Sequence, residues 1–102
     1  MRIKYRPAAI ADLERACAYL RNNLHNPGAA NTLSTRVLHS ISLLKENPYM
    51  GASLASKNEG LETNYRYLIV SKQLVFYEVD GELIEIVRIL DGRTDYLAQL
   101  LG

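Results

Sequence analysis

The spacing of apolar residues changes once along this chain, and that change limits the folds the chain can adopt. In the first half, apolar side chains recur every three or four positions, which predicts two amphipathic helices over residues 8–24 and 30–44. From residue 64 the period becomes two, in segments rich in β-branched and aromatic side chains. These segments predict three strands, at 64–70, 73–79 and 82–90. Helices followed by a run of strands indicate the α+β class.

Turn-forming residues mark the ends of these elements. Residues 26–28 (Asn-Pro-Gly) end the first helix and residues 47–48 (Asn-Pro) end the second, because the residue before a proline disfavours helical backbone. A loop is expected over 49–62. The pairs at 71–72 (Ser-Lys) and 80–81 (Asp-Gly) predict tight hairpins, so the three strands form an antiparallel meander.

A short strand at residues 2–6 and a last helical turn at residues 95–101 complete the order β-α-α-β-β-β-(short α). Both helices must bury their apolar stripes, and only the sheet offers a large apolar surface. We therefore expect one domain, residues 1–102, with a helical hairpin packed on one face of an antiparallel sheet and the other face open to a partner. The stripes are Ile10, Leu13, Cys17, Leu20 and Leu24, then Ala30, Leu33, Val37, Ile41 and Leu44.

The charge is nearly balanced but unevenly distributed. Twelve Lys and Arg against eleven Asp and Glu give a net charge of +1, too small for a general attraction to nucleic acid. Residues 1–47 hold seven basic and three acidic groups, whereas residues 63–102 hold four basic and six acidic groups. A positive patch is therefore expected on the helices, unless folding gathers the few C-terminal arginines.

The sequence lacks the patterns of several protein classes. No apolar run approaches the roughly 18 residues that a membrane span needs, and no leader precedes the first strand, so a cytoplasmic protein is expected. The single cysteine, Cys17, falls on the first helical stripe and is expected to be a buried thiol. Neither a cluster of metal-ligating side chains nor a glycine-rich phosphate loop is present, so no metal or cofactor is expected.

Short motifs along nearly the whole chain, in a fixed order, resemble the RelE/ParE toxin superfamily. In the C-terminal half they are Tyr65-Arg66, Val75-Phe76-Tyr77, the strand from Ile84 to Leu90, and Gly92-Arg93-Thr94-Asp95-Tyr96. In the N-terminal half they are Ala9, Asp12 and Leu13, then Asn26-Pro27 followed by Ala29-Ala30, and Leu44 with Pro48 and Gly51. The resemblance implies the RelE/ParE fold and the toxin of a type II toxin–antitoxin system.

The resemblance also implies partners and two modes of action. A cognate antitoxin is expected to wrap the toxin with an amphipathic helix and an extended segment, and operator DNA is then reached only through the antitoxin. ParE-like members inhibit growth, and so stabilise plasmids, by binding DNA gyrase, whereas RelE-like members cut mRNA in the ribosome. We expect the ParE-like mode, because the strand at 73–79 has no Lys or Arg and carries Leu74 where ribonuclease members usually have a basic residue. The alternatives are a RelE-like endoribonuclease and a toxin fold that has lost toxicity.

The candidate site residues are basic, acidic and aromatic side chains of the C-terminal half. For target binding they are Arg66, Arg88, Arg93, Asp95 and Tyr96, and for ribonuclease chemistry Arg66, Arg88, Arg93 and Tyr96. Tyr77 is a second candidate proton donor or stacking ring, and Lys57 is a reserve cation in the loop. In RNA cleavage, cations hold the phosphate as negative charge builds, and an acid protonates the leaving oxygen.

Most of these residues also have a structural explanation. Arg88 lies within an apolar strand and could pair with Asp95 or Glu78, while Asp95 could instead bridge to Arg93 or start the last helix. Tyr65 and Tyr77 could fill core space with their hydroxyls satisfied, and His25 and His39 are expected to be solvated helix residues. Alternation does not decide which side of the last strand is buried. The two sets are Ile84, Ile86, Arg88 and Leu90, and Leu83, Glu85, Val87 and Ile89.

Overall fold

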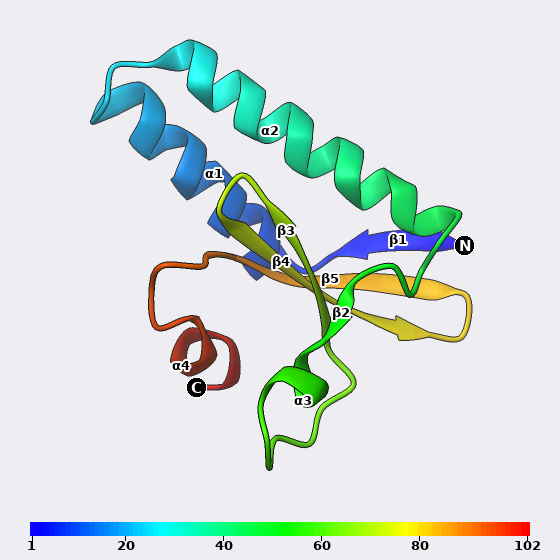
Figure 1. The fold of residues 1–102 in the computed structure, drawn as a ribbon. Coiled ribbons are helices and arrows are strands. Elements are labelled where there is room, and N and C mark those ends of the chain that lie inside the picture. The colour runs from blue at the N-terminus through cyan, green and yellow to red at the C-terminus, as the bar shows by residue number, and fades with distance from the viewer.

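Five strands form one sheet in the computed structural model, which describes residues 1–102 (Figure 1). The strands are β1 (Arg2–Tyr5), β2 (Ala52–Ser53), β3 (Arg66–Val70), β4 (Gln73–Asp80) and β5 (Leu83–Asp91). Their spatial order is β1-β5-β4-β3-β2. The meander β3-β4-β5 is antiparallel as predicted, and the N-terminal strand β1 adds a parallel neighbour to β5.

The helices lie on both sides of this sheet. They are α1 (Pro7–Asn22), α2 (Pro27–Ser42) with the 3₁₀ turn η1 (Leu43–Lys45), α3 (Leu54–Lys57) and α4 (Tyr96–Leu101). The α1–α2 hairpin covers one face, while α3 and α4 lie on the opposite side (Figure 1). The α+β class and the predicted order of the main elements are confirmed.

Several boundaries differ from the sequence prediction, among them the starts of both long helices and the start of β3 at Arg66. Pro7 and Pro27 begin α1 and α2, because a proline at the first helical position lacks only an N–H that would have no partner there. Asn26 caps α2, its side-chain oxygen accepting a hydrogen bond from the Ala29 N–H at 3.0 Å. Residues 49–62, predicted as a loop, also contain β2 and α3.

The helix-facing core is built from the second helical stripe and from inward-facing strand residues. Val37, Ile41 and Leu44 of the second stripe are fully buried, as predicted. In the first stripe, however, Ile10 of α1 and Leu24 just beyond its end are exposed, whereas the small Ala9 of α1 is buried. Small residues let α1 approach its neighbours closely, so the buried face of α1 is rotated from the stripe of large apolar residues.

A second core covers the outer face of the sheet, which the sequence analysis expected to stay open. Its buried members are Leu54, Leu74, Phe76, Val87 and Leu90. Side chains of α4, of β3 and of the segment before β3 pack against them: Leu61, Tyr65, Tyr67, Tyr96, Leu97 and Leu100. A sheet with large apolar residues on both faces must bury both, and the short helices do so here. The outer face is therefore largely closed, although Ile69 of β3 remains strongly exposed.

A bulge in β5 decides which residues face each side. Tyr77 of β4 pairs with Ile86 and Phe76 pairs with Arg88, so Val87 is an extra residue. Before the bulge, the even-numbered residues Ile84 and Ile86 point to the helices. After the bulge, the odd-numbered Ile89 points to the helices as well. A bulge reverses alternation in this way because two residues of one strand oppose one residue of its partner.

Candidate functional site

The predicted site residues lie at two edges of the sheet. Arg66 is the first residue of β3, and its side chain donates hydrogen bonds to the segment that joins η1 to β2. Arg88, Arg93, Asp95 and Tyr96 lie where β5 leads into α4, on the far side of β4. The structure therefore separates Arg66 from the other four residues.

Arg88 is held by a buried carboxylate that the sequence analysis did not select as a site residue. Because β1 ends at Tyr5, the edge of β5 beyond Ile86 has no neighbouring strand. Asp12 of α1 occupies this edge, and its Oδ2 accepts hydrogen bonds from the Ile89 N–H at 3.0 Å and from Arg88 Nε at 2.7 Å. Its Oδ1 accepts from Arg88 Nη2 at 2.9 Å. Asp12 thus provides a hydrogen-bond partner for a backbone N–H at the unpaired edge of β5. It also binds Arg88 through both of its carboxylate oxygens.

The same carboxylate serves a second arginine. Arg15 Nη2 lies 2.8 Å from Asp12 Oδ1, and the Asp12 side chain is only 2% exposed. Arg88 also donates from Nη1 to the backbone oxygen of Gln99 at 3.1 Å, which ties β5 to α4. The hydrogen bonds to Asp12 raise the pKa of Arg88, so the guanidinium stays charged. Its hydrogen bonds are made to groups of the fold itself.

Neither acid that was expected to pair with Arg88 does so. Glu78 and Glu85 both accept hydrogen bonds from the guanidinium of Arg6, next to the end of β1. Asp95 takes the position before α4, yet its side chain makes no capping hydrogen bond. Asp12 holds Arg88 instead, because α1 crosses the open edge of β5 directly beside it.

Arg93 folds back onto Asp91 rather than onto Asp95. Its Nη2 lies 2.6 Å from Asp91 Oδ2, its Nε lies 2.9 Å from Oδ1, and its backbone N–H also donates to Oδ1 at 2.8 Å. These contacts lower the pKa of Asp91 to about 2, with a smaller electrostatic contribution from Lys72. Thr94 adds a hydrogen bond from its hydroxyl to the Asp91 backbone oxygen at 2.7 Å. The turn between β5 and α4 is therefore closed by its own side chains.

Tyr96 packs into the outer core. Its ring centroid lies 5.8 Å from that of Phe76, and Phe76 lies 6.1 Å from Tyr67 on β3. The three rings form a row across the outer face of the sheet, at distances typical of aromatic pairs. Tyr96 thus anchors the first turn of α4.

Arg66 and Tyr77 belong to a separate network that fixes the segment before β2. The buried Tyr77 hydroxyl accepts from the Gly51 N–H at 2.9 Å and donates to the Pro48 backbone oxygen at 2.9 Å. Burial raises the pKa of Tyr77, partly offset by the Gly51 hydrogen bond. Arg66 donates from Nε to the Gly51 oxygen at 3.1 Å, and its guanidinium lies over the Tyr49 ring, 5.4 Å from the centroid. Both side chains are engaged within the fold.

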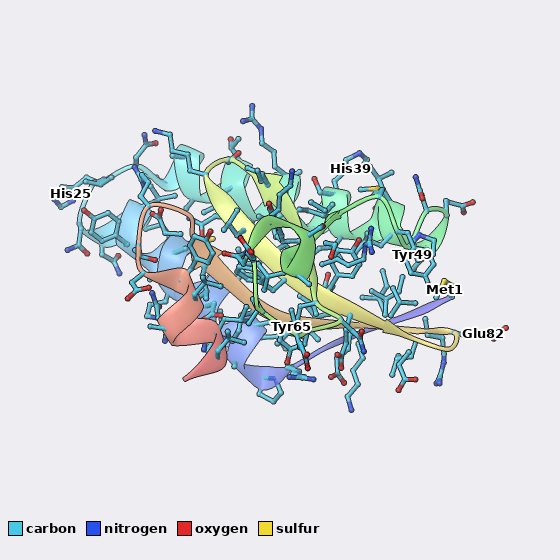
Figure 2. All side chains as sticks on the ribbon, turned by 60° about the horizontal axis from the view of Figure 1, so that its bottom comes forward. Met1, His25, His39, Tyr49, Tyr65 and Glu82 are labelled. Atoms are coloured by element: carbon cyan, nitrogen blue, oxygen red, sulfur yellow. The ribbon has the colours of Figure 1, made fainter.

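The remaining candidates lie apart from these networks. His25 is at the tip of the helical hairpin and His39 projects from α2 away from the sheet (Figure 2). Lys57 is exposed at the end of α3. Cys17 is buried between the helices, with Sγ 3.6 Å from the Ala30 oxygen. None of the four contacts Arg88 or Arg93 through a hydrogen bond.

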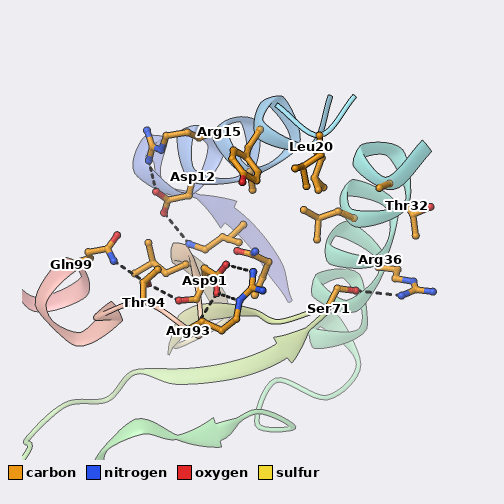
Figure 3. Close-up of a pocket in the computed structure, with 18 residues that line it drawn as sticks. Asp12, Arg15, Leu20, Thr32, Arg36, Ser71, Asp91, Arg93, Thr94 and Gln99 are labelled. Atoms are coloured by element: carbon orange, nitrogen blue, oxygen red, sulfur yellow. Dashed lines mark hydrogen bonds and ion pairs between the residues drawn. The ribbon is translucent and has the colours of Figure 1, made fainter. Parts of the chain in front are cut away.

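A hollow lies between the helical hairpin and the end of the sheet (Figure 3). Its volume is about 700 Å³, and eight of its eighteen lining residues are hydrophobic. We call it the arginine groove, because guanidinium groups from α1, α2 and the β5–α4 turn border it. Its lining includes Asp12, Arg15, Tyr19, Leu20, Leu24, Leu33, Arg36, Ser71, Leu90, Asp91 and Arg93.

Two further features bear on the possible chemistry. No group of three or more His, Cys, Asp or Glu side chains is placed to hold a metal ion. None of the helices has the length and apolar character that crossing a membrane requires.

Comparison with known proteins gives a family and a fold. A family model described as the ParE toxin of the type II toxin–antitoxin system, parDE, matches residues 3–96. A solved structure titled as the chromosomal ParDE TA system from P. aeruginosa is 22% identical, with a TM-score of 0.72 over 89% of this chain and 95% of that chain. The crystal structure of YafQ from E. coli strain BL21(DE3) is 18% identical, with a TM-score of 0.53 over the whole of both chains. No curated protein sequence matches the chain. At these identities the two structures show a shared fold.

Proposed function

The chain belongs to the ParE toxin family of type II toxin–antitoxin systems, and on that premise we propose that it inhibits growth by binding DNA gyrase. A cognate antitoxin neutralises it by covering part of its surface. Contact with operator DNA is made by the antitoxin, and no cofactor takes part. The toxin acts as a binding protein and performs no chemistry of its own.

The observation that supports binding over catalysis is the internal use of the candidate catalytic groups. A ribonuclease needs cations and a proton donor that can reach the phosphate as charge develops on it. Arg88 is bound to Asp12 and Gln99, and the Tyr77 hydroxyl is buried between Gly51 and Pro48. The strand β4 also contributes no basic side chain, since its sequence is QLVFYEVD.

A supercoiling assay with purified gyrase tests this proposal. We expect the isolated chain, at micromolar concentration, to inhibit supercoiling, and we expect cell-free translation to continue without new mRNA ends. Unimpaired gyrase at a large excess of the chain would overturn the proposal. The antitoxin, added at equal concentration, is expected to restore supercoiling.

The alternative function is a RelE-like, ribosome-dependent mRNA endoribonuclease that uses Arg66, Arg88, Arg93 and Tyr96. The observation that favours it is the Arg93 side chain, which is 67% exposed despite its pair with Asp91. Arrested translation with new mRNA ends, lost in Arg93→Ala and kept in a matched Arg21→Ala variant of α1, would establish this function. A chain that leaves growth unchanged when expressed without antitoxin would instead be a toxin fold without toxicity.

The antitoxin is tested separately from the target. The short protein encoded beside this chain is expected to co-purify with it when the two are produced together. Gel-shift measurements with operator DNA are expected to show binding by the antitoxin and by the complex, and none by the toxin alone. A toxin that purifies without its neighbour, or that shifts the operator by itself, would contradict this part of the proposal.

A further inference from the structure

A second groove runs along the helical hairpin, between α1 and α2. We call it the hairpin groove. Its volume is about 420 Å³, and eight of its twelve lining residues are hydrophobic. The hairpin groove and the arginine groove have one lining residue in common, Ile89 of β5, and use different residues of both helices. The two helices therefore present a different surface to each groove.

The hairpin groove leaves large apolar side chains in contact with solvent. Its small lining residues Ala9, Cys17 and Ala30 are buried, whereas Ile10 of α1 and Leu38 of α2 are 46% and 44% exposed. Single exposed apolar residues are common on protein surfaces, but here two of them border one hollow. A partner that enters this hollow can cover both residues and pack against the small ones.

Two charged residues line the hairpin groove, Glu14 and Arg21 of α1. Both are exposed, and neither forms an ion pair within the chain. They are seven positions apart on one helix, so about 10 Å of helix axis separates them, too far for them to pair with each other. The groove thus offers one acid and one base, each without a partner.

A second copy of α1 in antiparallel orientation carries the complementary charges. Contacts across a two-fold axis are reciprocal, so if Glu14 meets Arg21 of the second copy, Arg21 also meets Glu14 of that copy. The axis then passes beside Cys17 and Ala18, midway between the two charged residues. Both residues are small, so the two helices can approach each other closely at this point.

The same register gives Ile10 an apolar neighbour. It places Ile10 level with the tip of the second copy's helical hairpin, where Leu24 is 54% exposed. Ile10, Glu14, Cys17 and Arg21 follow one another at spacings of four, three and four, which put them on one face of α1. One face of α1 is therefore complementary to itself in charge.

We propose that the chain forms a two-fold dimer through the hairpin groove, with α1 of one copy antiparallel to α1 of the other. A partner of one charge sign fits less well, because an acidic segment is repelled by Glu14 and a basic one by Arg21. α1 has 16 residues and is about 24 Å long, so the interface is small and we expect a dissociation constant of roughly 10–100 μM. The inference goes beyond the proposed function and depends on neither gyrase nor the antitoxin.

Sedimentation equilibrium of the full chain without antitoxin tests whether the dimer forms. We expect the average mass to rise from that of one chain toward that of two as the concentration passes through the micromolar range. A chain that stays monomeric at about 500 μM, well above the expected dissociation constant, would overturn the proposal. If the monomeric chain also binds its antitoxin less tightly in the variant Ile10→Ala, the groove belongs to the antitoxin instead.

Charge reversal tests the register of the two helices. Glu14→Arg and Arg21→Glu should each weaken self-association by about tenfold, because the two-fold axis repeats the resulting repulsion. An equimolar mixture of the two variants should dimerise about as tightly as the parent protein, since one variant then carries two bases and the other two acids. The matched control, Glu46→Arg beside η1, should change the dissociation constant less than about twofold. A mixture that associates no better than its components, or an equal loss in the control, would refute this interface.

Truncation of an apolar side chain tests the same interface without changing charge. Ile10→Ala should weaken self-association by about tenfold, because each dimer loses the contact twice. The matched control is Ile69→Ala on β3, which removes an exposed isoleucine from another surface and should have an effect of less than about twofold. Both side chains are exposed, so the melting temperatures of the dilute variants should match that of the parent protein. Equal losses of affinity in the two variants would contradict the assignment to the hairpin groove.

Discussion

Replacing Asp12 with alanine is expected to destabilise the protein by about 3 kcal/mol. The side chain is almost fully buried and accepts four hydrogen bonds: one from the Ile89 N–H, two from Arg88 and one from Arg15. Alanine leaves the Ile89 N–H without a partner in the interior, and it leaves the Arg88 cation without its counter-charge.

The magnitude follows from these two losses. An unsatisfied buried N–H costs about 1–3 kcal/mol, and breaking a buried ion pair costs about 3–5 kcal/mol. The ion-pair loss falls below that range, at about 2 kcal/mol, because Arg88 is 24% exposed and keeps the Gln99 oxygen. Loss of the pair with Arg15 contributes little, since exposed ion pairs give less than about 1 kcal/mol. Alanine offsets about half a kcal/mol of the loss, because it has a higher helix propensity than aspartate.

Urea titration and calorimetry measure this loss. For a domain of this size, 3 kcal/mol corresponds to a fall in melting temperature of about 12–20 °C. The control is Asp95→Ala, because Asp95 is an acid beside α4 whose side chain makes no capping hydrogen bond. We expect the control to lie within about 0.5 kcal/mol of the parent protein.

A double-mutant cycle separates the ion pair from the strand-edge hydrogen bond. Asp12→Ala with Arg88→Met leaves no unpaired buried charge, so the double variant should be less destabilised than the sum of the single variants by at least about 1.5 kcal/mol. Additive losses, or an Asp12→Ala variant no less stable than Asp95→Ala, would refute the assignment of Asp12 as the partner that holds Arg88.

Three other substitutions test single contacts. Tyr77→Phe leaves the Gly51 N–H and the Pro48 oxygen without their hydrogen-bond partner. The variant should lose about 1.5 kcal/mol of unfolding free energy, measured by urea titration. Gly51→Ala should cost about 2 kcal/mol in the same measurement, because its new Cβ would lie 2.6 Å from the Tyr77 hydroxyl oxygen. Asp91→Asn tests the pair with Arg93, which lowers the pKa of Asp91 from 3.8 to about 2. A lowered pKa stabilises the fold above about pH 4, and this contribution is lost as pH falls through about 2. The Asp91→Asn variant should therefore be less stable than the parent at pH 7, by less than about 1 kcal/mol, and equal to it only below about pH 2. An unchanged stability in Tyr77→Phe or Gly51→Ala, or a pH-independent difference in Asp91→Asn, would contradict the corresponding contact.

The sequence predicts the elements that are long enough to show a period. Two helices and three strands follow from spacings of 3.6 and 2, and the hairpins follow from the residues between the strands. β2 and α3 span two and four residues, too few for any period, and α3 depends on one serine cap and one buried leucine. The face that α1 buries was misplaced because Ala9 contributes little to a hydrophobic stripe, although it permits close packing.

The candidate site shows the same limit at longer range. A charged residue within an apolar strand identified Arg88, but its partner Asp12 is 76 residues away in sequence, where spacing gives no information. The one available indication was an acidic residue near the apolar stripe of the first helix. The alternation of apolar residues also could not predict the bulge at Val87. An extra residue in a strand exchanges the two faces of the sheet for every residue that follows it in that strand.

The strand-edge carboxylate has two separable roles in the fold. Asp12 accepts a hydrogen bond from the Ile89 N–H at the edge of β5, and Arg88 and Arg15 share its negative charge. Asp12→Asn keeps an oxygen for the Ile89 N–H but removes the charge. We therefore expect this variant to be less stable than the parent protein and more stable than Asp12→Ala, measured by urea titration. A stability equal to that of Asp12→Ala would show that the hydrogen bond to Ile89 contributes nothing.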